Sequence, residues 1–204
     1  VGNIIYSKVL SLNHNNLEMF YFKNKNTNGE YYDEEGKSIR KTLMRTPIDG
    51  ARISSKYGKR RHPILGYNKM HKGIDFAARS GTPIFAAGDG VIERANFYGG
   101  YGRYIRIKHN AEYKTAYAHL SKFAKNIKRG NRVKQGSTIG FVGTSGKSTG
   151  PHLHYEVIEN GKKINSQTLK LPPGKSLKGP VRENFEIVRI KTDVLKSDLI
   201  IKIN

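Results

Sequence analysis

Cysteine and tryptophan are both absent from the 204 residues of this chain. Without cysteine there can be no disulfide framework, no thiolate zinc ribbon and no thiol nucleophile. Any metal site must therefore be built from histidine, aspartate and glutamate side chains. The chain offers seven histidines and 16 acidic residues for that purpose.

Acidic residues are scarce: 16 Asp and Glu stand against 37 Lys and Arg, which leaves a net charge of +21 with histidine neutral. Such an excess predicts an acidic partner, and nucleic acid, an anionic membrane surface and an anionic cell-wall polymer would each attract the chain. Hydrophobic residues make up 36% of the chain and aromatic residues 10%. That content supports a globular core and argues against a wholly disordered basic tail.

Long hydrophobic runs are also missing. Even the most apolar N-terminal stretch is interrupted by Ser7 and Lys8, and a membrane helix needs roughly 18–20 apolar residues. We therefore expect the chain as given to be soluble. It begins at Val1 rather than at methionine, so we expect a signal peptide or membrane anchor upstream of it.

Twenty-two glycines punctuate the chain and predict many short strands and tight turns, hence a mainly β fold. Strand-like alternation occurs at 17–22, 104–108 and 155–158, and Asn160-Gly161 predicts a hairpin whose returning strand is 162–164. Only the segment 114–126 has a pattern that a helix could also explain.

Composition divides the chain into three regions. Residues 1–45 are polar and contain two expected strands, which suggests a β-rich arm or the remnant of a preceding domain. Residues 46–173 carry most of the glycines and histidines and are expected to form the main domain. Residues 174–204 form a basic C-terminal extension that contains the alternating stretch 185–190.

Two histidine motifs carry the chemistry. His71 and Asp75 are four residues apart, and Gly73 between them favours a turn or strand over a helix. Taken alone, this pair could be an ordinary surface pair. His152 and His154 are two residues apart, so on a strand they project from the same face; two solvent-facing polar residues would show the same spacing.

With His119, these residues could supply a metal site without sulfur. Two histidines and one carboxylate that leave one position open are what a catalytic Zn²⁺ site needs. The metal would lower the pKa of bound water, and the spare histidines would move protons or hold a developing oxyanion.

At this point the sequence resembles a known family, the M23 peptidases, which are lysostaphin-type or LytM-type zinc endopeptidases of peptidoglycan. The resemblance covers roughly residues 47–173 and extends beyond the histidines. Its motifs, in order, are Ile53-Ser54-Ser55-Lys56-Tyr57-Gly58, Arg61-His62-Pro63, His71-Lys72-Gly73-Ile74-Asp75, Gly81-Thr82-Pro83-Ile84, Gly99-Gly100-Tyr101-Gly102-Arg103-Tyr104-Ile105, Tyr117-Ala118-His119-Leu120 and the run from Val142 through Gly150 to Pro151-His152-Leu153-His154-Tyr155-Glu156.

The resemblance implies a compact antiparallel β-sheet domain with the site in a groove. It implies that His71, Asp75 and His154 bind Zn²⁺ and that His119 and His152 are the catalytic pair. Peptidoglycan peptides would be the substrate, and the stretch 32–45 resembles the Gram-negative periplasmic branch of D,D-endopeptidases. We accordingly expect a periplasmic or cell-envelope enzyme, monomeric, and attracted by its charge to an anionic wall or envelope polymer.

The remaining candidates are weaker. His62, in a basic run, His109, at a strand end, and His14, in a polar turn, are interpreted as structural or surface residues. Tyr67 could contribute a hydroxyl to the groove, although packing is its simpler role. Glu156 could orient a metal ligand or be solvated, and the sequence leaves both open.

Two other functions compete with the peptidase. A nucleic-acid-binding protein would explain the charge, but no recognised binding motif is present and the histidines would be unexplained, so we expect no specific nucleic-acid partner. An autoinhibited or non-hydrolytic regulator of the LytM type, which binds the cell wall or activates amidases, would share the fold. The amidase activators with this fold have lost metal ligands, and none of the five histidine and aspartate residues is missing here. The autoinhibited alternative stays open, because the arm 1–45 could occlude the groove.

Overall fold

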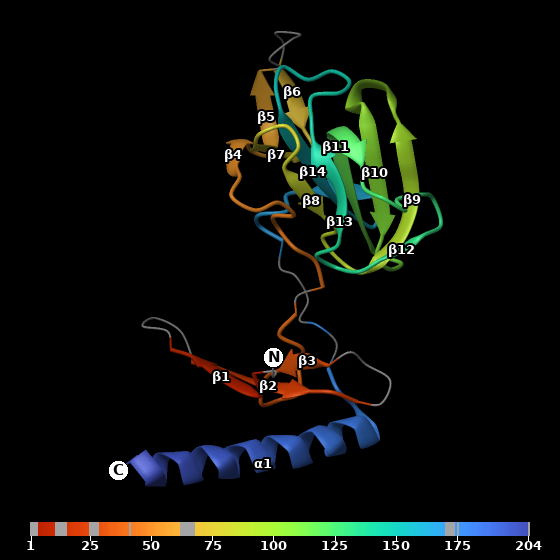
Figure 1. Ribbon diagram of the computed structural model, residues 1–204. Coiled ribbons are helices and arrows are strands. Elements are labelled where there is room, and N and C mark those ends of the chain that lie inside the picture. Colours follow the sequence, from red (N-terminus) through yellow and green to blue (C-terminus); the bar gives the residue numbers. More distant parts are fainter. Residues whose placement is uncertain are drawn as a thin grey trace. The chain divides into compact units, whose positions relative to one another are not determined.

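The computed structural model describes residues 4–10, 16–24, 29–40, 42–61, 68–169, 174 and 176–203, with only the backbone described at 60–61, 68–69 and 199–203. The chain divides into two compact units (Figure 1). One combines residues 1–42 with 171–204, and the other is Leu43–Lys170. The N-terminal arm and the C-terminal extension, which are far apart in the sequence, thus belong to the same unit.

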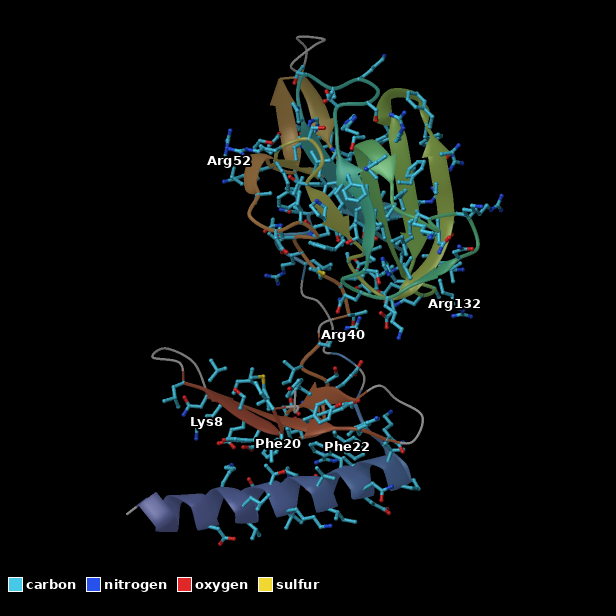
Figure 2. The ribbon with its side chains drawn as sticks, viewed as in Figure 1. Lys8, Phe20, Phe22, Arg40, Arg52 and Arg132 are labelled. Atoms are coloured by element: carbon cyan, nitrogen blue, oxygen red, sulfur yellow. The ribbon has the colours of Figure 1, made fainter. Side chains whose placement is uncertain are left out.

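The first unit pairs a small antiparallel sheet with one helix. Strands β1 (Tyr6–Val9), β2 (Leu17–Phe22) and β3 (Glu30–Tyr32) lie in the order β1-β2-β3. Phe20 and Phe22 project from β2 toward the helix α1 (Figure 2), where both rings contact Phe185 edge-on at centroid distances of 6.3 and 5.6 Å. This aromatic cluster is the core of the unit.

The alternating stretch at 185–190 is not extended, because it belongs to the helix α1 (Gly179–Ile203). The same residues place Phe185, Val188 and Thr192 three and four positions apart, which is helical spacing. Pro180 occupies the start of the helix, where its missing N–H costs nothing. In the described residues, no helix is long and apolar enough to span a membrane.

The second unit is an antiparallel β structure. Its main sheet runs in the order β12-β9-β10-β11-β14-β7-β4; β13 pairs with β11 and β8, β15 pairs with β14, and β5 and β6 form a separate hairpin. The elements are β4 (Arg52–Ser55), β5 (Gly58–Arg61), β6 (Asn68–His71), β7 (Ile74–Ala77), β8 (Pro83–Phe85), β9 (Gly90–Phe97), the short 3₁₀ helix η1 (Gly99–Tyr101), β10 (Arg103–Lys108), β11 (Tyr113–Phe123), β12 (Arg132–Val133), β13 (Thr138–Val142), β14 (His152–Glu159) and β15 (Lys162–Ile164).

The mainly β fold class is confirmed, and so are the hairpin β14–β15 and its Asn160-Gly161 turn. The helical alternative for 114–126 is wrong, because residues 113–123 form the central strand β11. Its neighbours β10 and β14 hydrogen-bond to both of its edges. The segment is a strand because of this pairing, which involves residues distant in the sequence and cannot be predicted from the local pattern.

Alternation along β14 separates the core of this unit from its site. Leu153 and Tyr155 point into the core and are fully buried, with Tyr117 of β11 packed against Tyr155 at a centroid distance of 5.5 Å. His152 and His154, which alternate with these two residues along the strand, point to the opposite face of the sheet. The strands that fill the core thus carry the histidines on their other side.

Candidate metal and catalytic site

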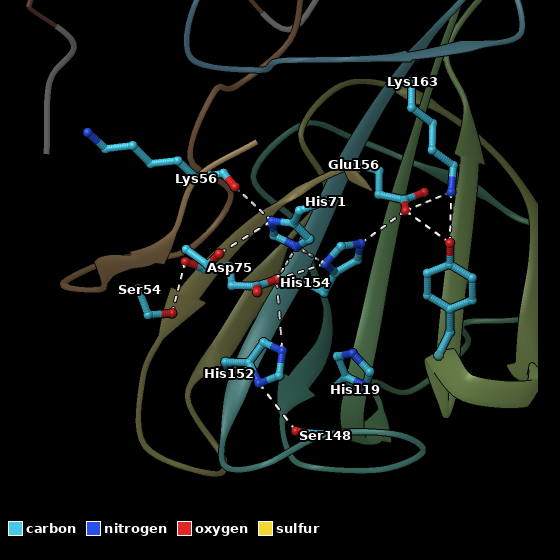
Figure 3. A network of polar contacts seen from close by, with 12 residues as sticks. Ser54, Lys56, His71, Asp75, His119, Ser148, His152, His154, Glu156 and Lys163 are labelled. Carbon is cyan, nitrogen blue, oxygen red and sulfur yellow. Dashed lines mark hydrogen bonds and ion pairs between the residues drawn. The ribbon is translucent and has the colours of Figure 1, made fainter. Parts of the chain in front are cut away.

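Three side chains from neighbouring strands converge on one point (Figure 3). His71 ends β6, Asp75 lies in β7, and His154 lies opposite Asp75 in the β7–β14 pair. Nε2 of His71 is 3.1 Å from Oδ1 of Asp75 and 3.1 Å from Nδ1 of His154, and the last two atoms are 2.7 Å apart. Tetrahedral zinc with bonds of about 2.0–2.1 Å separates its ligand atoms by roughly 3.3 Å, so the triangle fits such an ion.

The far nitrogens of both histidines are held by acceptors. His71 donates Nδ1–H to the carbonyl of Lys56 at 2.8 Å, and His154 donates Nε2–H to Oε1 of Glu156 at 3.0 Å. These bonds leave the lone pairs of His71 Nε2 and His154 Nδ1 directed toward Asp75. Ligating histidines in metal sites are oriented in this way, which also makes them more basic. Glu156, whose role the sequence left open, is buried and orients His154.

The electrostatics also favour a bound cation. Burial by itself lowers the pKa of His154, but its hydrogen bonds with the Asp75 and Glu156 carboxylates outweigh this and raise the pKa to about 9. Burial by itself raises the pKa of Asp75, yet the bonds with His154 and His71 hold that pKa well below its usual range. The Asp75 and Glu156 carboxylates around His154 thus favour positive charge at this centre.

Lys163 balances the buried carboxylate of Glu156. Its ammonium donates to Oε1 of Glu156 at 2.7 Å and to the hydroxyl of Tyr101 at 2.7 Å, and Tyr101 itself donates to the same carboxylate oxygen at 3.1 Å. Within the described part of the chain, no donor reaches Oε2 of Glu156. Burial by itself raises the pKa of Glu156, but its hydrogen bonds with His154 first and with Lys163 second lower that pKa below its usual value, so the carboxylate stays ionised.

His119 and His152 lie together beside this triangle, with ring centroids 4.7 Å apart. His119 donates Nδ1–H to the carbonyl of Ser145 at 2.8 Å, and His152 donates Nδ1–H to the carbonyl of Gly150 at 2.8 Å. Because a carbonyl can only accept, the Nε2 atom of each ring carries the lone pair. Nε2 of His152 is 3.9 Å from Oδ1 of Asp75, and burial lowers the pKa of His119 to about 4.

The backbone of His119 departs from the regular strand. Its φ is +63°, in the left-handed region, and the β10–β11 pairing shifts register between Arg103 and Ile105 at this point. An extra residue in one strand is a β-bulge, which re-aims a side chain, and the left-handed conformation costs roughly 1–2 kcal/mol for a residue with a Cβ. The bulge brings the His119 ring to the site.

These residues line a groove of about 730 Å³. Three lysines, Lys72, Lys147 and Lys163, lie among its walls. Gly73 is also essential to the shape, because a Cβ at this position would lie 2.6 Å from Cε1 of the His154 ring. From the sequence, Gly73 was interpreted only as a residue that disfavours a helix. Its position between His71 and Asp75 is the one sequence feature that could have indicated its second role, which is to leave room for the His154 ring.

The structure thus brings together all five residues singled out from the sequence, and their catalytic roles stay predictions. His14, His62 and Tyr67 lie outside the described residues. His109 follows β10, as expected, but its ring is hydrogen-bonded to the Asp89 carbonyl at 2.8 Å and to the hydroxyl of Thr115 at 2.7 Å.

The fold and site define a β-sheet protein with a His–Asp–His cluster that could hold a metal ion and two further histidines in one groove. Residues 69–166 match the model of Peptidase family M23. The catalytic domain of lysostaphin from Staphylococcus simulans superposes with a TM-score of 0.53 at 34% identity, covering 58% of this chain and 91% of that one. The chain belongs to peptidase family M23.

Two further comparisons extend this relationship. The peptidoglycan DD-endopeptidase ShyC of Vibrio cholerae is 46% identical over 158 residues, which are 77% of this chain and 36% of that protein. A zinc-containing peptidase from Vibrio cholerae has a TM-score of 0.61 and 35% identity, covering 78% of this chain and 48% of that one. The chain thus spans about a third of the length of this curated relative.

Proposed function

We propose that this protein is a zinc-dependent endopeptidase that hydrolyses peptide crosslinks of peptidoglycan. One observation carries the proposal: three ligand atoms form a closed triangle, and two histidines with free Nε2 lone pairs stand beside it. The name of the Vibrio cholerae relative supports the substrate. The resemblance of residues 32–45 to the Gram-negative branch favours the D-alanine to diaminopimelate bond, which is the crosslink that we propose.

His71, Asp75 and His154 would hold the zinc ion, because their donor set matches a catalytic site of two histidines and one carboxylate. When bound, zinc activates a water and polarises the carbonyl of the scissile peptide. Glu156 keeps His154 in the tautomer whose Nδ1 is free for the ion, and the Lys56 carbonyl does the same for His71.

His119 and His152 would move the protons. Each ring has its Nδ1–H fixed to a backbone carbonyl, so the Nε2 lone pair of each can accept a proton from the attacking water. A ring that has accepted a proton becomes a donor at Nε2, where it can stabilise the oxyanion or protonate the leaving amine. Burial lowers the pKa of His119 to about 4, so this ring is neutral and able to accept at neutral pH.

The chain's charge gives the enzyme a second means of staying on its substrate. We propose that the net charge of +21 holds it on an anionic wall or envelope polymer in the periplasm or cell envelope. Residues 46–173 would be the peptidase domain, with the arm 1–45 and the extension 174–204 outside it. All five site residues meet within one chain, which supports our proposal that the enzyme acts as a monomer.

The test is digestion of purified peptidoglycan followed by mass spectrometry of the released muropeptides. A chelator should stop the release of fragments and added zinc should restore it. Products that arise by opening of crosslinks indicate an endopeptidase, whereas loss of only a terminal D-alanine contradicts the proposed bond. Protein that binds zinc yet releases nothing would favour the regulator instead.

Two variants separate the roles of the histidines. His154→Ala should lose the metal, measured as zinc per chain, because it removes one corner of the triangle. His152→Ala should keep zinc and lose hydrolysis by at least about 100-fold, the usual contribution of a positioned acid or base. Full turnover in His152→Ala would show that this assignment is wrong.

A further inference from the structure

Ser145 bridges the two strands at the bulge that carries His119. It lies in the loop between β13 and β14 and does not line the groove. Its hydroxyl accepts the N–H of Arg103 in β10 at 2.9 Å and donates to the carbonyl of Leu120 in β11 at 2.7 Å. Arg103 and Leu120 are register partners immediately beside the bulge, so a single side chain joins the two strands where their pairing is disturbed.

The backbone of Ser145 contacts the His119 ring directly. Its carbonyl accepts Nδ1–H of His119 at 2.8 Å, and this bond leaves Nε2 of the ring as the acceptor. Ser145 thus holds His119 in two ways, because the hydroxyl supports the left-handed backbone and the carbonyl sets the tautomer.

The loop that carries Ser145 is itself fastened by close backbone packing. The N–H of Lys147 donates to the carbonyl of Gly100 at 2.8 Å. Gly102 has φ +66°, and a Cβ there would lie 2.3 Å from the carbonyl carbon of Ser145. Gly146 has φ +76°, and its Cβ would lie 2.4 Å from the amide nitrogen of Gly102. Glycine at both positions lets the two loops approach closely enough for Ser145 to reach the bulge.

We propose that Ser145 is the positioning residue of His119, an inference that rests on the proposed function. The hydroxyl bridge holds the bulge in the conformation that directs the ring into the groove, and the carbonyl fixes Nε2 as the proton acceptor. Ser145 touches none of the three metal ligands in the described structure, so its role is separable from metal binding.

The experiment compares Ser145→Ala, which removes the bridge, with Ser145→Thr, which keeps the hydroxyl. The matched control is Ser121→Ala, since the Ser121 hydroxyl is also half-buried and bonds a strand carbonyl, that of Phe141 at 3.2 Å, without bridging the bulge. We expect unchanged zinc per chain in all three. In Ser145→Ala, kcat should fall about 10–100-fold with little change in KM, because a misplaced proton acceptor affects turnover rather than binding.

A second readout does not depend on activity. Nitrogen-15 NMR of the zinc-loaded protein reports which ring nitrogen of His119 carries the proton. The wild type and Ser145→Thr should show one tautomer with Nδ1–H. Ser145→Ala keeps the backbone carbonyl but loses the hydroxyl bridge that holds it against the ring, so it should show a mixture. If Ser145→Ala does not fold, Ser145→Cys retains the size of serine with a weaker hydrogen-bonding group, and it should show intermediate turnover.

Wild-type turnover together with a wild-type His119 tautomer in Ser145→Ala, or in Ser145→Cys if that variant is used, would overturn the inference. A fall equal to that of Ser121→Ala would do the same, because it would indicate a general loss of stability. If the wild type releases no fragments from peptidoglycan, the proposed function fails. The tautomer measurement then still decides whether Ser145 positions the ring.

Discussion

The ion pair between Lys163 and Glu156 gives a sharp test of the site's electrostatics. The Glu156 side chain is 1% exposed, and its Oε1 atom accepts from the ammonium of Lys163 at 2.7 Å. Replacing Lys163 by Met keeps most of the aliphatic stem and removes the charge. Breaking a buried pair by removing one partner costs about 3–5 kcal/mol when the other charge stays buried without compensation. Here His154 and Tyr101 still donate to Glu156 after the replacement, which favours the lower end of that range.

The structure places the expected cost at the lower end of that range. The Lys163 side chain is 27% exposed, so water can reach the vacated position and partly solvate the carboxylate. We therefore expect the free energy of unfolding of metal-free protein to fall by about 3 kcal/mol in Lys163→Met. For a unit the size of Leu43–Lys170, that corresponds to a decrease in Tm of roughly 10 °C.

A double variant identifies the cause. In Lys163→Met/Glu156→Gln the buried charge is gone, so most of the stability should return, to within about 1 kcal/mol of the wild type. Lys163→Arg is the control that keeps a cation at the same position. Urea unfolding followed by circular dichroism, with chelator present, measures all four proteins. A loss below about 0.5 kcal/mol in Lys163→Met, or a double variant no more stable than the single one, would refute the reasoning.

Two further predictions test other parts of the unit. Gly73→Ala should weaken zinc binding about 10–100-fold, the usual cost of disturbing a residue that orients a metal ligand, because the new Cβ would lie 2.6 Å from the His154 ring. Competition with a chelator measures the affinity. The control Gly100→Ala, whose Cβ would contact only Lys147 at 3.4 Å, should bind zinc normally. Burial lowers the pKa of His109 below its usual 6.5, so its contribution to stability is present above about pH 6.5 and is lost as the pH falls toward the lowered value. The free energy of unfolding of the wild type should therefore decrease more between pH 7 and 5 than that of His109→Gln at equal zinc content, and equal slopes would contradict the assignment.

Much of the second unit could be predicted because its patterns are local. Alternation at 155–158 and the turn at Asn160-Gly161 predict β14 and β15, since a two-residue turn fixes which strands pair. The first unit was harder. The stretch 185–190 satisfies both a strand and a helix pattern, and the contact of Phe185 with Phe20 and Phe22, more than 160 positions away in the sequence, distinguishes them.

The site, too, has features that the local sequence predicts and features that depend on tertiary contacts. The sequence by itself determined the donor types, because the absence of cysteine leaves only nitrogen and oxygen ligands. The resemblance of its motifs to family M23 implied that His71, Asp75 and His154 are the ligands. It could not show that Glu156 is buried beside His154, because burial depends on β11 and β15 packing beside β14.

Only the tertiary structure decided how His119, one of the two proposed catalytic histidines, is held. The left-handed backbone of His119 costs energy locally, so no propensity of the residues around it predicts that conformation. It is maintained by Ser145, which arrives from a different loop and bonds both strands at the bulge. The residue types thus predicted which side chains could bind a metal or move protons. The orientation of those side chains depends on contacts between segments distant in the chain.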